Sequence, residues 1–275
     1  MKKVYMCFTT DVIHEGHYNI IKKAKEYGEL YVGVMTDRAM VSFDRFPTIS
    51  FEKRLQQIKN IPEIDHVIVQ DSVMYDSVIK ELEPDYIVHG DNWLTGVTRI
   101  IRDNAEKTLK VYGGSIIDIP YTYNDTVRKI DKKMQAKLMM PEFRRRRLRQ
   151  LLEIRPIVKA IEVHNGITGL IAEKTVVESE GQLDQFDAMW ISSLCDSIAK
   201  GKPDIEVVDM TSRYRTIDDV MEVTTKPIIF DGDTGGKTEH FVYTVRTLER
   251  MGVSAVIIED KVGLKQNSLF GNEVI

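Results

Sequence analysis

The apolar run Val4-Tyr5-Met6-Cys7-Phe8, followed a few residues later by His14-Glu15-Gly16-His17, is the stretch that decides the fold of this chain. In residues 18–27, which come next, the apolar side chains at positions 20, 21, 24 and 27 share one helical face. The two histidines therefore lie where a strand ends and a helix begins. Gly16 lets the backbone approach a ligand closely, and the start of a helix offers free N–H groups to an anion. This placement predicts phosphate chemistry, although two histidines three residues apart are also found as ordinary surface or core residues.

The composition excludes several classes of protein. The chain has 275 residues, enough for two domains with their own cores, and its formal net charge of -4 gives no general reason to expect nucleic-acid binding. Its two cysteines, Cys7 and Cys195, lie far apart, so neither a disulfide framework nor a zinc site is indicated. No signal peptide and no apolar run of membrane-spanning length is visible, so we expect a cytoplasmic protein.

Strand-like and helix-like segments alternate along residues 1–133. Strands are expected at 4–8, 30–35, 66–69, 86–88 and 115–119, with helices near 18–27, 51–60 and 73–82. This alternation predicts an α/β fold with a doubly wound, parallel, Rossmann-like sheet, in which ligands bind beyond the carboxyl ends of the strands. The residues that follow the expected strands are polar and suited to ligand binding: Thr9, Thr10, Asp11, Thr36, Asp37, Arg38, His89, Gly90, Asp91, Asn92, Trp93, Pro120, Tyr121 and Thr122.

These segments resemble the cytidylyltransferase branch of the HxGH nucleotidyltransferases. The pattern is Asp11-x-x-His14-x-Gly16-His17, then Thr36-Asp37, Glu52-Lys53-Arg54 and His89-Gly90-Asp91-Asn92-Trp93. The resemblance implies that the catalytic residues His14 and His17 contact the triphosphate of CTP, with Mg²⁺ bridging the phosphates, while an acceptor oxygen attacks the α-phosphorus. It also implies that Gly90-Asp91-x-Trp93 reads the cytosine nucleotide, and that Arg54 and Lys22 or Lys23 assist the phosphates. The nucleotide-binding residues expected on this basis are Thr9, Thr10, Asp11, Gly16, Lys22, Asp37, Arg54, Gly90, Asp91, Trp93 and Thr122.

The last signature of that family, Arg-Thr-Glu-Gly-Ile-Ser-Thr-Thr, is matched only in part. Pro120-Tyr121-Thr122-Tyr123-Asn124-Asp125-Thr126 keeps the first threonine but has a tyrosine for the arginine and lacks the glycine; Asp125 and Thr126 are alternatively caps of the next helix. Phe8-Thr9-Thr10-Asp11 also differs from the Gly-Thr-Phe-Asp of enzymes that act on alcohol phosphates. Both differences disfavour a polyol or choline phosphate as the acceptor. That acceptor class remains an alternative, as does a non-catalytic nucleotide-binding module.

The composition changes around Pro141, which predicts a linker at residues 134–143. Beyond it, Arg144-Arg145-Arg146-Arg147 is either a nucleic-acid patch or the solvated face of an amphipathic helix whose Leu148, Leu151 and Leu152 pack inward. The acidic chain and the absence of interleaved aromatic residues favour the second interpretation.

Residues 144–275 contain a second series of strands with polar ends. Apolar strands are expected within 161–166, 188–194, 227–236 and 255–261, with a helix at 241–251, as in part of a (β/α)8 TIM barrel. Asp231, Asp233 and Glu259 form a carboxylate set of the kind that holds Mg²⁺ directly or through water. Taken singly, each acid is equally well explained as a loop cap or an ion-pair partner.

This second half resembles phosphoenolpyruvate mutase. The segments are Glu162-x-His164-Asn165-Gly166, Trp190-x-Ser192-x-Leu194, Asp231-Gly232-Asp233-Thr234-Gly235 and Glu259-Asp260-Lys261. The Lys-Lys-Cys-Gly-His run of isocitrate lyases is missing, which disfavours the lyase branch. The resemblance implies that Asp231 faces Mg²⁺ with Asp233 and Glu259 in its water shell, and that Asp209 is an active-site aspartate. It further implies a substrate cradle of Trp190, Ser192, Ser193 and Leu194, and a gating loop with Lys265, catalytic Asn267 and Ser268.

Together the two resemblances predict a bifunctional protein of phosphonate biosynthesis. The mutase reaction converts phosphoenolpyruvate to phosphonopyruvate, and the cytidylyltransferase converts a small phosphonate, such as 2-hydroxyethylphosphonate or 2-aminoethylphosphonate, to its CMP derivative. A complete barrel takes about 250 residues, so we expect residues 144–275 to form a truncated and inactive mutase. The expected partners are CTP, a phosphonate, phosphoenolpyruvate and further copies of the chain in a homo-oligomer, without nucleic acid or membrane.

Overall fold

The structure, a computed structural model, divides into two compact units. It describes residues 1–9, 11–42, 47–94, 98–120, 125–179, 182–260 and 265–266. Unit 1 comprises residues 1–133 together with 176–184, and unit 2 comprises residues 134–175 and 185–275. No helix in the described part of the chain is long and apolar enough to cross a membrane.

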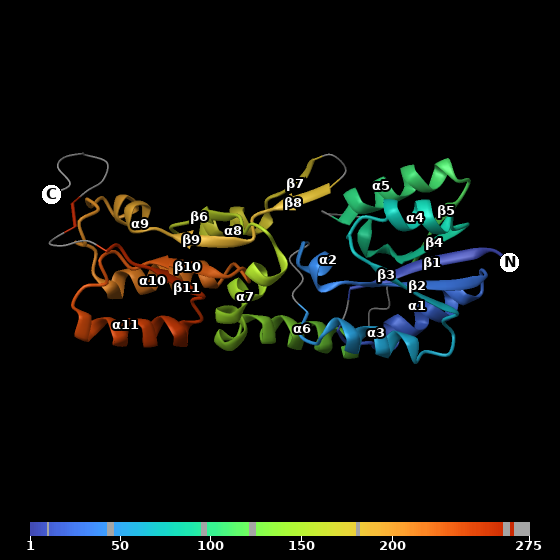
Figure 1. Cartoon of the computed structure of the whole chain (residues 1–275), viewed down its shortest axis with the longest axis horizontal. Coiled ribbons are helices and arrows are strands. Elements are labelled where there is room, and N and C mark those ends of the chain that lie inside the picture. The colour runs from blue at the N-terminus through green and yellow to red at the C-terminus, as the bar shows by residue number, and fades with distance from the viewer. Residues whose placement is uncertain are drawn as a thin grey trace. The chain divides into compact units, whose positions relative to one another are not determined.

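Unit 1 is built on a five-stranded sheet with the order β3-β2-β1-β4-β5, in which all neighbouring strands are parallel (Figure 1). The strands are β1 (Lys3–Phe8), β2 (Glu29–Met35), β3 (His66–Gln70), β4 (Tyr86–Gly90) and β5 (Ser115–Ile119). The helical elements between them are α1 (Glu15–Lys25), α2 (Asp37–Ser42), α3 (Phe51–Lys59), α4 (Asp76–Leu82), the short 3-10 helix η1 (Asp91–Trp93) and α5 (Thr98–Val111). Because the strand order reverses at β1, the predicted doubly wound sheet is confirmed.

Helices cover both faces of this sheet, and each face has its own core. On one face α2, α4 and α5 bury Met40, Ile79 and Ala105, whereas on the other face α1 and α3 bury Ile21 and Ile58. Parallel strands covered on both faces are apolar throughout, which explains why the strands read as continuous apolar runs in the sequence. The carboxyl ends of β1, β2, β4 and β5 therefore meet at one edge, where polar side chains are free to gather.

The expected linker at 134–143 is helical for most of its length. Helix α6 (Asp125–Met139) ends at Met139. Met140 separates it from α7 (Pro141–Ile154), which has its proline in the first helical turn. Two of the four consecutive arginines face inward: Arg144 donates to the carbonyls of Met139 and Met221, and Arg147 to that of Leu138.

The amphipathic-helix interpretation of the arginine run thus needs a correction. Leu151 is buried as expected, but Leu152 is exposed, and part of the inward face consists of the two arginines. Their buried guanidinium groups bond to backbone carbonyls, which the sequence pattern gave no means of foreseeing.

Unit 2 contains a four-stranded parallel sheet with the order β11-β10-β9-β6 (Figure 1). Its strands are β6 (Ala160–Glu162), β9 (Ala188–Ile191), β10 (Ile228–Asp231) and β11 (Ala255–Ile257), and its helices are α8 (Gly166–Lys174), α9 (Ser193–Ala199), α10 (Met210–Met221) and α11 (Thr238–Met251). The strands follow one another in sheet order, as in the wall of a barrel, so the predicted barrel-like arrangement is confirmed. A two-stranded sheet of β7 (Val176–Ser179) and β8 (Gln182–Gln185), whose residues 176–184 belong to unit 1, lies between β6 and β9 in sequence and was not predicted.

The sheet of unit 2 is covered by helices on one face. Met189 and Ile191 of β9 and Phe230 of β10 pack into a core with side chains of α8, α10 and α11. Trp190 lies between Met189 and Ile191 on β9, so its side chain points to the opposite face, where it is 37% exposed. Ile257 of β11 is 47% exposed. This alternation is what strands of period two require when only one face is packed.

Candidate functional site

His14 and His17 lie at the start of α1, as the sequence predicted. His14 is the N-cap residue of this helix and has an extended backbone. The centroids of the two imidazole rings are 3.9 Å apart, and the edge of Phe8, at the end of β1, packs on His17 with a centroid distance of 5.1 Å. The strand end and the helix start thus hold the two rings together at the first turn of α1.

The protonation state of His17 follows from its surroundings. Burial, and secondly the charge of His14, lower the pKa of His17 from 6.5 to about 3, so the ring is neutral at pH 7. The backbone N–H of His14 donates to Nδ1 of His17 at 3.3 Å. In a neutral imidazole the other nitrogen then carries the proton, so Nε2 of His17 is a hydrogen-bond donor.

Arg54 of α3 links the loops that follow β1 and β2. Its side chain is 1% exposed, and its guanidinium donates to the carbonyl of Met35 at 2.6 Å and to Oδ1 of Asp37 at 2.5 Å. Nε of Arg54 lies 3.7 Å from Oδ1 of Asp11, whose other oxygen accepts from the backbone N–H of Thr48. The sequence placed Arg54, Asp11 and Asp37 in one site, and the structure brings them together as an ion-pair network around the buried guanidinium of Arg54. The phosphate contact of Arg54 stays a prediction.

At the end of β4 the Trp93 indole is buried, with 2% of its surface exposed. The ring of His89 stacks on it at a centroid distance of 3.9 Å and an interplanar angle of 11°. Nε1 of Trp93 donates to Oδ1 of Asp118 at 2.6 Å, and Arg102 donates to Oδ2 of Asp118 at 2.7 Å. Burial raises the pKa of Asp118, but the hydrogen bonds from Arg102 and Trp93 outweigh this and bring the pKa below its ordinary value. Asp118 was missed in the sequence, where its position inside a strand was the only signal.

Of the remaining predicted residues of unit 1, Gly16 lies in the first turn of α1 and Lys22 in its last turn. Asp91 begins η1 directly after Gly90 at the end of β4, and Lys22 lies exposed on α1. Thr10 and Thr122, together with residues 121–124 of the partial signature, lie outside the described residues.

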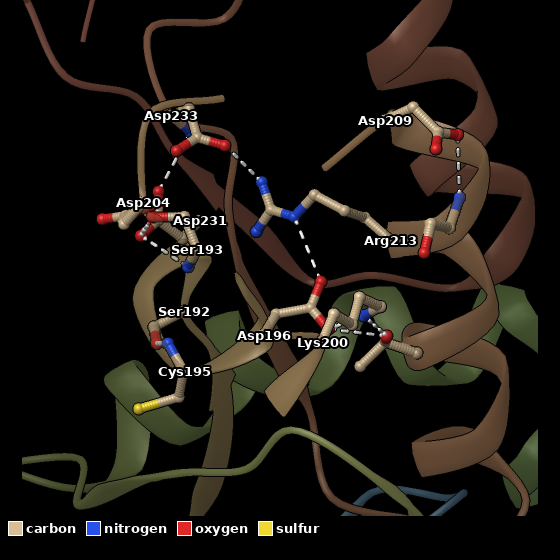
Figure 2. Close-up of polar contacts among 12 residues, drawn as sticks. Ser192, Ser193, Cys195, Asp196, Lys200, Asp204, Asp209, Arg213, Asp231 and Asp233 are labelled. Carbon is tan, nitrogen blue, oxygen red and sulfur yellow. Dashed lines mark hydrogen bonds and ion pairs between the residues drawn. The ribbon is translucent and has the colours of Figure 1, made fainter. Parts of the chain in front are cut away.

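In unit 2 the expected carboxylates lie at the carboxyl end of β10. Asp231 accepts from the backbone N–H and the hydroxyl of Ser193 at 3.1 and 3.0 Å through Oδ2, and from the backbone N–H of Asp233 at 3.0 Å through Oδ1 (Figure 2). Burial raises the pKa of Asp231, but these hydrogen bonds leave it below the ordinary value. Asp233 has a φ of 55°, a left-handed conformation that is strained for a non-glycine residue and that is maintained here by its contacts.

Asp233 is paired with two protein cations. Nη1 of Arg213 donates to its Oδ2 at 2.5 Å, and Nζ of Lys265 donates to its Oδ1. Lys265 also donates to Asp204 at 2.9 Å and to the hydroxyl of Ser193 at 2.6 Å, and lies 3.9 Å from Glu259. Burial raises the pKa of Asp233, while the contacts with Lys265 and Arg213 oppose that change.

These contacts do not favour a divalent cation at Asp233, because both of its carboxylate oxygens already accept from cationic groups of the protein. Within the described ranges, no three His, Cys, Asp or Glu side chains are grouped so that they could hold a metal ion. In place of the expected water shell of Mg²⁺, Asp233 therefore contacts Arg213 and Lys265, whereas the metal contacts expected of Asp231 and Glu259 stay predictions.

Asp209 and Asp204 have different hydrogen-bond partners and different roles in the structure. Asp209, expected in the active site, is the N-cap of α10, and its Oδ1 accepts from the backbone N–H of Ser212 at 3.1 Å (Figure 2). Asp204, five residues earlier, is buried and bonded to Lys265. Asp204, not Asp209, is thus the aspartate of the cluster. The motif Lys202-Pro203-Asp204 between two helical stretches was the available signal.

The expected substrate cradle of unit 2 is only partly assembled. Ser192 is the N-cap of α9, where its hydroxyl accepts from the N–H of Cys195 and donates to Glu162 at 2.9 Å, and Ser193 bonds to Asp231. Trp190 points to the exposed face of the sheet, and Leu194 lies in α9. Asn267 and Ser268 lie outside the described residues.

Comparison with known protein families gives two matches. Residues 7–157, more than half of the chain, match the model described as cytidylyltransferase-like, and residues 148–273 match that of phosphoenolpyruvate phosphomutase. The first match supports an enzyme of the nucleotidyltransferase type, and the second shows that residues 148–273 are similar to phosphoenolpyruvate phosphomutase.

Three relatives illustrate the matches. Phosphoenolpyruvate phosphomutase of Streptomyces hygroscopicus is 34% identical over 128 residues, which cover 46% of this chain and 38% of the relative. The 2-methylisocitrate lyase of Aeropyrum pernix is 33% identical over 116 residues, covering 42% of this chain and 35% of the relative. The FAD synthase of Methanocorpusculum labreanum is 30% identical over 110 residues, covering 40% of this chain and 78% of the relative.

The extent of these matches limits what they show. This chain spans 38% and 35% of the length of the phosphomutase and the lyase, so the reaction of a whole mutase does not transfer with the match. The FAD synthase is matched over 78% of its length, in agreement with a nucleotidyltransferase-like unit 1. The chain belongs to the cytidylyltransferase-like family through residues 7–157, which are fused to a region of the phosphoenolpyruvate phosphomutase family.

Proposed function

We propose that residues 1–133 form a cytidylyltransferase domain, which transfers CMP from CTP to an anionic oxygen of a small phosphonate and releases pyrophosphate. The observation that carries this proposal is the pair His14 and His17 at the start of α1, with His17 neutral and its Nε2 protonated. The start of a helix favours an anion, and the neutral ring of His17 can donate a hydrogen bond to an oxygen of the triphosphate.

In the proposed reaction the acceptor oxygen forms a bond to the α-phosphorus while the bond from that phosphorus to the bridging oxygen breaks. Pyrophosphate leaves with the electron pair of the broken bond. A phosphonate is already anionic near neutral pH, so the domain needs no general base. His14 and His17 donate hydrogen bonds to the phosphate oxygens as charge develops on them. Mg²⁺ would enter this unit with the nucleotide and neutralise the phosphates. Losing one such donor lowers the rate by about 10²–10³-fold.

The nucleotide is proposed to lie along the carboxyl edge of the sheet. Asp91, at the start of η1, is proposed to contact the base, and Trp93 to fix the position of η1 from its buried site under His89. Arg54 is proposed to act by holding the loops of Asp11 and Asp37. The complete set of proposed nucleotide-binding residues remains Thr9, Thr10, Asp11, Gly16, Lys22, Asp37, Arg54, Gly90, Asp91, Trp93 and Thr122.

The phosphonate acceptor is proposed from the fusion. Residues 148–273 match the phosphomutase model, whose name joins it to phosphoenolpyruvate chemistry, and fused domains commonly act in one series of reactions. We propose residues 144–275 as the mutase-like domain, with 134–143 as the connection, and with Trp190, Ser192, Ser193 and Leu194 near its substrate. We do not propose turnover of phosphoenolpyruvate by this domain alone, because Asp233 is occupied by Arg213 and Lys265.

A second candidate is transfer of AMP from ATP to a flavin mononucleotide. It is favoured by the FAD synthase relative, which is matched over 78% of its length. It shares the fold and the histidine pair with the first candidate and differs in the base and in the acceptor. A third candidate, a module that binds nucleotide without turnover, follows from the partial match of residues 120–126.

One experiment separates these candidates. The protein is incubated with Mg²⁺, with CTP or ATP, and with 2-hydroxyethylphosphonate, 2-aminoethylphosphonate, glycerol phosphate, choline phosphate or flavin mononucleotide, and pyrophosphate release is measured. We expect release with CTP and a phosphonate, and loss of release in His17→Ala. His66→Ala is the matched control, because His66 is a surface histidine of the same unit that stacks on Tyr31.

Each outcome has one interpretation. Release with ATP and flavin mononucleotide alone would replace the proposal by the second candidate, and release with polyol or choline phosphate alone would change the acceptor class. Calorimetric binding of CTP without release on any acceptor would favour the module. Equal rates in His17→Ala and His66→Ala would remove the histidine pair from the mechanism.

A further inference from the structure

The four carboxylate oxygens of Asp231 and Asp233 are all occupied by groups of the protein itself. Oδ1 of Asp231 accepts from the backbone of Asp233, and Oδ2 accepts twice from Ser193. Oδ1 of Asp233 accepts from Lys265 and Oδ2 from Arg213 (Figure 2 shows the Arg213 contact). Mg²⁺ demands oxygen ligands in an octahedron at about 2.0–2.1 Å, and the two oxygens of Asp233, which accept from an ammonium and a guanidinium, offer it no favourable position.

All three N–H donors of the Lys265 ammonium group are used in hydrogen bonds within this cluster. A protonated lysine has three donors, and those of Lys265 go to Asp233, Asp204 and Ser193, with Glu259 as a further negative neighbour at 3.9 Å. The side chain is 2% exposed. Two of its three hydrogen-bond partners are carboxylates, which favour the charged ammonium.

Arg213 supplies a second, permanent charge beside it. It extends from α10 between Asp233 and Asp196, with Nε 3.5 Å from Asp196, and its guanidinium lies over the ring of Phe230 at 4.4 Å (Figure 2). Guanidinium groups do not lose their proton in proteins. Because the side chain is 2% exposed and packed on an aromatic ring, its charge is fixed in position next to the carboxylates.

We propose that unit 2 holds its paired carboxylates with its own cations in place of a divalent metal ion, with Lys265 in the position of that ion and Arg213 as its support. Paired buried carboxylates need compensating charge, and these two side chains provide it from α10 and from the segment after β11. Unit 2 is then a metal-independent member of its family. The proposal concerns unit 2 and does not depend on the function proposed for residues 1–133.

Titration of the whole protein with Mn²⁺, in the absence of nucleotide, tests the proposal. Free Mn²⁺ is measured by its electron paramagnetic resonance signal, and thermal unfolding is recorded with Mg²⁺ and with EDTA. We expect no stoichiometric Mn²⁺ binding by the unmodified protein, and the same unfolding midpoint in Mg²⁺ and in EDTA.

Removal of the internal ammonium gives the second arm. In Lys265→Ala the carboxylates of Asp204, Asp233 and Glu259 lose their shared cation, so Mn²⁺ binding tightens by about tenfold or more and Mg²⁺ raises the unfolding midpoint by about 2–4 °C. Lys202→Ala, an exposed lysine of the same unit, is the matched control and behaves as the unmodified protein. Lys265→Gln, which keeps donor groups without the charge, carries the same expectation should the alanine variant fail to fold.

Two results would overturn the proposal. One is stoichiometric Mn²⁺ bound to the unmodified protein and lost in Asp233→Asn, which would mean that a metal displaces Lys265. The other is unchanged Mn²⁺ binding in both folded Lys265 variants, which would mean that the ammonium does not occupy the place of a cation.

Discussion

Arg54→Met tests whether a buried guanidinium holds the loops after β1 and β2 in place. The substitution keeps the length and apolar stem of the side chain and removes the donors to the Met35 carbonyl and to Asp37, together with the charge near Asp11. We expect unit 1 to lose stability, and CTP to bind less well because Asp11 and Asp37 are among the proposed nucleotide-binding residues.

The magnitude follows from the contacts. Two hydrogen bonds from a charged donor contribute about 1.5–3 kcal/mol each, and removing one partner of a buried ion pair costs about 3–5 kcal/mol. The Asp37 side chain is 37% exposed, so solvent screens its share of the interaction. We therefore expect the free energy of unfolding of unit 1 to fall by about 3–4 kcal/mol.

The assay is urea unfolding followed by tryptophan fluorescence. The chain has 2 tryptophans, and in a Trp190→Phe background the remaining one, Trp93, lies in the core of unit 1 and reports on that unit alone. Arg38→Met is the matched control, because Arg38 is exposed in the same unit, and surface substitutions change stability by less than about 0.5 kcal/mol. A loss below about 1 kcal/mol in Arg54→Met, combined with weaker CTP binding, would refute the structural role and leave Arg54 as a direct phosphate contact.

Three further predictions concern other parts of the chain. The pKa of His17 is lowered from 6.5 to about 3, chiefly by burial, so between these pH values the unfolded chain binds a proton that the folded chain does not. The free energy of unfolding should therefore fall by up to about 1.4 kcal/mol per pH unit as the pH drops through this window. Calorimetry at several pH values should find a weaker pH dependence of stability in His17→Asn. Trp93→Phe removes the 2.6 Å hydrogen bond to Asp118 and should lower the stability of unit 1 by about 1.5–3 kcal/mol, measured by thermal unfolding; no change would show that this bond is not needed. Asp209→Ala should lower the unfolding midpoint of unit 2 by removing the cap of α10, and Asp209→Asn should restore it, whereas a catalytic carboxylate would not tolerate asparagine; circular dichroism follows both.

Much of unit 1 was predictable because each of its features is local in sequence. The strand ending at Phe8 and the helix after His14 follow from apolar periodicity, and alternation of the two element types requires a parallel sheet. The edge at which His14, Asp37 and Asp91 gather follows in turn from the direction of parallel strands. The family matches confirm the resemblance that these motifs carry.

The tertiary structure decided how charged side chains are used, because partners distant in sequence determine their roles. Arg54 and Arg144 read as surface or phosphate-binding groups, yet both are buried against backbone carbonyls that no local pattern identifies. Asp204 and Asp209 look alike in the sequence. Asp209 is a cap because a helix starts after it, whereas Asp204 belongs to a buried cluster because Lys265, 61 residues after Asp204, bonds to it. Apolar residues act through periodicity, which one segment displays by itself, whereas the energy of a buried charge depends on which opposite charge reaches it, and only the folded chain fixes that pairing.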